Sequence, residues 1–155
     1  DTYEARANLS WAATIGLNWI LQQGKLGDWA THQLSYPVTT DYHVTHGYAL
    51  AMLMPSWMRI ALKYNPEAME KRLIFLGEEV FNVSEAEQTI QAIEDVFKSY
   101  GAHASLIDGG IIPNQEQLKT WADLSTELGS LGNVVKIDNA KAFEIYQHAS
   151  RLNIK

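Results

Sequence analysis

Cysteine is absent from the 155 residues of this chain. Without thiols the protein can form neither a disulfide framework nor a thiolate metal site, so a bound metal must take nitrogen and oxygen ligands. Histidine, aspartate and glutamate are therefore the side chains among which a metal site has to be sought.

Basic clusters and long apolar runs are missing as well. The twelve Lys and Arg are scattered along a chain of formal net charge −6, which lacks the electrostatic footprint of a nucleic-acid-binding protein. The longest apolar runs, such as 48–54, are far shorter than the roughly 20 residues that span a bilayer, and no signal-peptide pattern opens the sequence. We therefore expect no nucleic-acid partner, no membrane association and a cytoplasmic protein.

The residues that are present describe a folded domain. Apolar residues make up 46% of the chain and charged residues 19%, with five Trp and seven Tyr, and the length suits one domain. The chain opens directly in a helix-like segment without an initiator Met. This start leads us to expect a piece of a longer polypeptide.

Helical signals recur from end to end. Apolar residues at the 3.6-residue period, with caps and glycine stops, predict helices over 2–22, 28–35, 44–63, 66–81, 85–100, 114–128 and from 138 onward. Segment 102–113 is the one loop-rich stretch, and no pair of alternating strands is present. Residues 1–155 are therefore predicted to form a single all-α domain of about seven helices.

Prolines and N-cap residues set the expected helix ends and kinks. Pro37 should end the second helix and Pro55 should kink the third. Ser84-x-x-Glu87 has the spacing of a capping box. Side-chain caps are expected at Asp28, Asn65, Asn114 and Asp138. Four tryptophans are assigned to packing, namely Trp11, Trp19, Trp57 and Trp121.

One segment carries most of the side chains that are candidates for metal binding or catalysis. It holds His32, His43 and His46, three of the five histidines, together with Asp28. Asp28 and His32 have i, i+4 spacing, and His43 and His46 have i, i+3 spacing, so each pair shares a helical face if the helices extend that far. Spacing alone also allows capping and surface roles for all four, because a stereotyped motif such as His-Glu-x-x-His is absent.

The amino-acid sequence around these histidines resembles that of the iron-dependent alcohol dehydrogenase family, and most of all its butanol-dehydrogenase-like branch. The segments that carry the resemblance are 7–13, 27–32, 45–47, 49–51 and 55–58, and it continues more weakly to the C-terminus. It implies the family's helical C-terminal domain, of the dehydroquinate-synthase-like type. The N-terminal dinucleotide-binding domain would then be absent from this chain, which has no glycine-rich fingerprint after a strand.

The resemblance also implies a metal site shared with the missing part. His32 and His46, fourteen residues apart, match the family's second pair of metal ligands, and the first pair, Asp-x-x-x-His, would lie upstream of Asp1. Asp28 imitates that spacing but aligns elsewhere, so it is expected to cap a helix or to orient a ligand. The implied cofactors are Fe²⁺ or Zn²⁺ and NAD or NADP, the latter bound mainly by the missing domain.

One position departs from the family. Many members carry a histidine four residues after the first ligand histidine, and this chain has Tyr36 there. A phenol has a reference pKa of about 10 against about 6.5 for imidazole, so Tyr36 is a poor proton relay near neutral pH. Either the relay runs through another group, for which His43 is a candidate, or this member has altered chemistry. Trp29, Tyr42 and Tyr48 are candidates for lining the substrate pocket.

The implied function is an NAD(P)-dependent dehydrogenase of alcohols or aldehydes, homodimeric at full length, whose isolated helical part is inactive. Two alternatives stay open on the sequence. The chain is either a non-catalytic helical interaction module with incidental histidines, or a self-contained metal-binding bundle. The second alternative needs further ligands from Asp28, Asp41 or His43.

Overall fold

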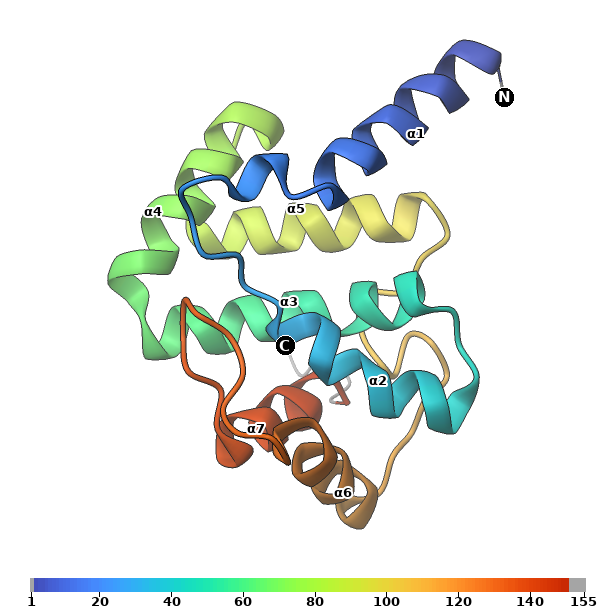
Figure 1. Ribbon diagram of the computed structural model, residues 1–155, viewed down its shortest axis with the longest axis vertical. Helices are drawn as coiled ribbons and strands as arrows, with labels where there is room; N and C mark the ends of the chain where they lie inside the picture. The colour runs from blue at the N-terminus through green and yellow to red at the C-terminus, as the bar shows by residue number, and fades with distance from the viewer. Residues whose placement is uncertain (1, 151–155) are drawn as a thin grey trace.

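The computed structural model describes residues 2–150 and shows a helical domain (Figure 1). Seven α-helices lie in this part of the chain: α1 (Tyr3–Leu17), α2 (Ala30–Tyr42), α3 (His46–Tyr64), α4 (Pro66–Leu76), α5 (Ala86–Ser99), α6 (Gln115–Thr126) and α7 (Asn139–Ala149). A 3₁₀ turn, η1 (Ile20–Gln22), follows α1, and a π-helical turn, η2 (Gly77–Phe81), follows α4. Residues 2–150 contain no strand, only an isolated bridge between Leu131 and Ile137, so the all-α prediction is confirmed.

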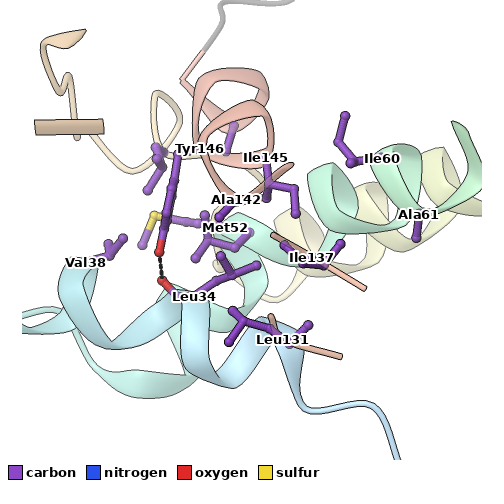
Figure 2. Close-up of a cluster of buried hydrophobic side chains, with 14 of the residues drawn as sticks. Leu34, Val38, Met52, Ile60, Ala61, Leu131, Ile137, Ala142, Ile145 and Tyr146 are labelled. Atoms are coloured by element: carbon purple, nitrogen blue, oxygen red, sulfur yellow. Dashed lines mark hydrogen bonds between the residues drawn. The ribbon is translucent and has the colours of Figure 1, made fainter. Parts of the chain in front are cut away.

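The central helix α3 packs against α2, α4, α5 and α7, and α6 completes a second layer with α2 and α7. The core between them is closely packed, with Leu34, Met52, Ile137, Ile145 and Tyr146 almost fully buried (Figure 2). Trp121 is fully buried too, as predicted. Trp57 lies partly buried at the edge of this core.

Three of the predicted caps are confirmed. The side chains of Asn65, Asn114 and Asp138 accept hydrogen bonds from backbone N–H groups in the first turns of α4, α6 and α7. The predicted capping box is wrong: Glu85 is the N-cap of α5 and makes no side-chain capping bond. Glu87 instead accepts a hydrogen bond of 2.7 Å from Nε of Arg59 on α3. A tertiary ion pair thus takes the place of the predicted capping hydrogen bond.

The predicted first helix over 2–22 is interrupted. Asn18 Oδ1 accepts a hydrogen bond of 3.1 Å from the Ile20 N–H, an alternative to the helical bond that favours a turn. Trp19 then adopts a left-handed conformation with φ 68°, which is rare for a bulky residue. The chain leaves α1 at this point and enters η1.

Pro37 does not end the second helix, contrary to the sequence prediction. It lies inside α2, where its missing N–H leaves the Gln33 carbonyl without a helical donor. Side-chain hydroxyls support the neighbouring carbonyls: Ser35 donates to His32 O, and Thr39 donates to Ser35 O. Pro37 and the residue after it are buried, so tertiary packing holds the helix together through the proline.

The buried hydroxyl of Tyr146 on α7 also reaches this part of α2. It donates a hydrogen bond of 2.6 Å to the carbonyl of Leu34, drawn as a dashed line in Figure 2. A carbonyl only accepts, so the proton of Tyr146 is committed and Ser125 must donate the 2.7 Å bond that joins the two hydroxyls. Burial raises the pKa of Tyr146 well above its ordinary value, which keeps the phenol protonated.

No helix within residues 2–150 is both long and apolar enough to cross a membrane.

Candidate metal centre

His32 and His46 are brought together by the turn between α2 and α3. His32 lies in the first turn of α2, and His46 is the first residue of α3. Between them, His43 ends α2 in a left-handed conformation with φ 52°, which lets α3 fold back along α2. The two imidazole ring centres are 5.2 Å apart. Two imidazoles bound at about 2.1 Å to one tetrahedral ion would have ring centres about 5 Å apart, so the spacing suits a shared metal.

Ser35 fixes the orientation of the His46 ring. Its Oγ lies 3.2 Å from His46 Nδ1 and donates its own proton to the His32 carbonyl at 2.7 Å. Because that proton is committed, Ser35 can only accept from the ring, and His46 Nδ1 must carry the hydrogen. The lone pair of His46 is then on Nε2, the tautomer that a metal ligand needs. Sequence reasoning overlooked Ser35, although its i, i+3 spacing from His32 was visible.

His32 is held neutral by its surroundings. Burial, and to a smaller extent the neighbouring His46, lower the pKa of His32 below its ordinary value. Its Nδ1 atom is buried and has no hydrogen-bond partner within the described residues. A buried nitrogen without a partner is costly for the fold, so an additional partner would stabilise this ring.

Aromatic rings surround the pair. Trp29 meets His32 edge-on with ring centres 4.6 Å apart, and Tyr36 lies roughly parallel to His46 at 6.0 Å. Trp19 in turn contacts Trp29 at 5.4 Å. These rings flank the histidines without enclosing them, because His46 and Tyr36 are both exposed and His32 is half-buried.

A cavity of about 420 Å³ adjoins Tyr36. It lies between α2, the end of α6 and the segment that follows α6, and its walls include Gln33, Tyr36, Leu124, Leu128 and Leu131. The cavity is large enough for a small organic molecule.

Asp28 does not face the histidines. Its Oδ2 accepts hydrogen bonds of 2.7 Å and 2.8 Å from the N–H groups of Asn133 and Val134, and its Oδ1 accepts one of 3.0 Å from Ala30 N–H. The N-cap position itself belongs to Trp29, one residue later than predicted. Asp28 thus supports the start of α2 but mainly anchors the loop between α6 and α7.

The other predicted site residues point elsewhere. Tyr42 packs on α6, where its hydroxyl donates to Gln117 Oε1 at 3.1 Å. Asp41 Oδ2 accepts from Trp121 Nε1 at 2.7 Å. Tyr48 lies beside His103, with ring centres 6.2 Å apart.

His43 is exposed, and no ring contact joins it to His32 or His46 in the part of the chain that is described. Helix α3 begins at His46, not near residue 44, so the two histidines do not share a helical face as the i, i+3 spacing suggested. Residues 2–150 contain no group of three or more His, Asp or Glu side chains placed to hold a metal ion. The geometry therefore brings two imidazoles together, and it gives no support to a self-contained metal-binding bundle.

Comparison with known proteins identifies the class. Residues 1–150 match the Fe-containing alcohol dehydrogenase family, C-terminal. The chain belongs to this family, as the sequence resemblance implied, and the histidine pair is set in the family's helical domain.

Individual relatives agree with this assignment. The chain is 36% identical over 153 residues to a probable NADH-dependent butanol dehydrogenase 1 of Bacillus subtilis, and 32% identical over 157 residues to the NADH-dependent butanol dehydrogenase B of Clostridium acetobutylicum. These alignments cover 94% and 95% of this chain but only 38% and 39% of the relatives.

The crystal structure of NADH-dependent butanol dehydrogenase A from Thermotoga maritima superposes with a TM-score of 0.84 at 31% identity. The match covers 97% of this chain and 40% of that one. The chain thus spans about two fifths of the length of the proteins that it resembles, and it corresponds to a helical region of them.

Proposed function

We propose that this chain is the helical part of an NAD(P)-dependent, iron-dependent alcohol dehydrogenase, in which His32 and His46 are two of the metal ligands. The observation that carries the proposal is the pairing of these two rings at 5.2 Å, with His46 oriented by Ser35. Iron is preferred to zinc because the family is iron-containing. The substrate class is a small alcohol or aldehyde, in keeping with the names of the relatives.

A divalent iron held by His32, His46 and two ligands from the rest of the full-length protein would supply Lewis-acid polarisation of the substrate oxygen. The residues of this chain prepare that site. The lowered pKa of His32 keeps its ring neutral at pH 7, and the Nδ1–H bond to Ser35 holds the other ring in a ligand tautomer. Trp29 and Tyr36 flank the two rings with aromatic surface.

Proton transfer needs a separate group. Tyr36 Oη can donate a hydrogen bond to the substrate oxygen from its place beside His46, but a phenol is a poor proton relay near neutral pH. His43 is exposed on the turn between α2 and α3, and its imidazole suits a relay to solvent. We assign the relay to His43 and substrate orientation to Tyr36.

The remaining parts of the enzyme belong to the full-length protein. The nicotinamide cofactor is assigned to an N-terminal dinucleotide-binding domain, and the full-length protein is expected to be a cytoplasmic homodimer. The 155-residue chain alone should bind metal weakly and show no turnover, because residues 2–150 supply two of the four proposed ligands and the sequence has no dinucleotide fingerprint.

The test uses the full-length gene product. Its iron content and its reduction of a panel of aldehydes with NADH and with NADPH are measured for the parent, His32→Ala and His103→Ala. The last variant removes an exposed histidine on another loop and is the control. Iron content and activity should fall together in His32→Ala alone. Unchanged iron stoichiometry in that variant contradicts the ligand assignment.

A further inference from the structure

The N-terminal apolar surface, formed by Tyr3, Leu9, Trp11, Leu17, Trp19, Ile20, Leu21 and Leu26, is uncovered. These eight are among the seventeen large apolar side chains that are exposed in residues 2–150, although they come from only the first 26 positions. Trp11 is 66% exposed and Trp19 is 58% exposed, so neither is buried in this domain, contrary to the sequence prediction. Figure 1 shows α1 projecting away from the other helices, and its main neighbour is η1.

The composition of α1 requires a cover on more than one side. Positions 7–24 hold no charged residue, and no side chain of α1 is buried. Large apolar side chains lie on more than one side of α1, between its polar residues, whereas a helix at a single interface gathers its apolar side chains on one face. A Cβ placed on Gly16 would meet no atom within 4 Å, so this face is open to the close approach of another helix.

We propose that the N-terminal apolar surface is the docking site for the preceding part of the same polypeptide in the full-length protein. This rests on the proposed function, in which the chain is the helical part of a longer dehydrogenase. The relatives are more than twice as long as this chain, so they contain enough further polypeptide to enclose α1. A segment tethered directly ahead of α1 has a high effective concentration at this surface. A second copy related by a two-fold axis would cover one face of α1 and leave the others in water.

The docking surface is continuous with the metal centre. Trp19 contacts Trp29 at 5.4 Å, and Trp29 contacts His32 at 4.6 Å. A hollow of about 290 Å³ lies at this junction, with Trp19, Gln22, Leu26 and Trp29 in its walls. A segment that seats on α1 and fills this hollow ends next to His32. Docking of the preceding polypeptide and completion of the metal site are therefore one event.

Hydroxyl-radical footprinting of the full-length protein, read by mass spectrometry, tests the docking. Trp121 is the buried reference at 0% exposure, and Phe75 on α4 is the exposed reference at 67%, close to the value for Trp11. Trp11 should be labelled as slowly as Trp121, at every protein concentration. Labelling at the rate of Phe75 overturns the proposal, and protection that is lost on dilution assigns the surface to a second copy and overturns it too.

Matched variants of the full-length protein provide a second measurement. Trp11→Lys should lower the Tm and reduce iron content, whereas Phe75→Lys should change neither. If Trp11→Lys does not fold, the footprint of the parent still decides the question. Activity separates the two proposals: an active enzyme with an exposed Trp11 contradicts only the docking, and an inactive, iron-free protein with a protected Trp11 contradicts only the proposed function.

Discussion

The hydroxyl of Tyr146 donates a 2.6 Å hydrogen bond to the carbonyl of Leu34, and so ties the last described helix to the one that carries His32. Tyr146→Phe removes this bond and leaves the Leu34 carbonyl and the Ser125 hydroxyl without their partner in a buried setting. We expect a loss of about 1–3 kcal/mol in the free energy of unfolding. Urea unfolding of the chain measures it, with Tyr100→Phe, an exposed tyrosine, as the control. Equal stabilities of the two variants would contradict the role of the bond.

Asp28 is expected to be a structural anchor and not a metal ligand. Asp28→Ala removes the acceptor of three backbone N–H groups, two of which lie in the loop between α6 and α7. The free energy of unfolding should fall by about 2 kcal/mol or more, because hydrogen bonds to charged groups are the stronger ones. Asp95→Ala, on the exposed side of α5, is the control. A chain as stable as the parent after Asp28→Ala would disprove the anchor.

Ser35 should control metal affinity without touching the metal. In the full-length protein, Ser35→Ala leaves His46 Nδ1 without its acceptor, so the ring is free to rotate and to change tautomer. Iron affinity should fall by about 10–100-fold, the usual effect of removing a group that orients a ligand. Titration with iron measures it, with Ser99→Ala on α5 as the control. Unaltered affinity would show that Ser35 does not position the ring.

The start of α7 should contribute pH-dependent stability. The side chain of Lys141, and then its backbone N–H, hydrogen-bond to Asp138 and lower the pKa of that carboxyl. Because the folded pKa lies below the unfolded value of about 3.9, the stabilisation is present above that pH and is lost as the pH falls through the folded pKa. Asp138→Asn keeps a good cap but removes the charge. The Tm values of the two proteins should differ at pH 7 and converge at low pH. Thermal melts recorded across this pH range measure the convergence.

The sequence predicted the helices well because most of them carry their own signals. Asn65, Asn114 and Asp138 act on N–H groups three residues away, so local spacing was enough to locate them. Pro37 was misread because the groups that hold α2 together come from elsewhere, among them Tyr146 at a separation of 112 residues. Tertiary packing overrides propensity in such cases.

The candidate site divides in the same way. His32 and His46 could be predicted as candidate ligands from the family-like sequence around them. The structure adds that their rings are neighbours. The true partners of Asp28 are 105 and 106 residues away, which no local pattern reveals. The exposure of Trp11 and Trp19 could not be predicted for a different reason. Tryptophan is usually at least partly buried, and the described part of the chain does not bury these two side chains.

The bond between Tyr146 and Leu34 also bears on biosynthesis. A ribosome makes α2 long before α7, so during translation the Leu34 carbonyl and the surrounding apolar face of α2 stay without their partners. Domains fold as units once their contacts are complete, and here the partner from α7 is among the last to emerge. The two histidines are therefore expected to reach their final orientation only near the end of synthesis, and the iron of the proposed site would enter after translation.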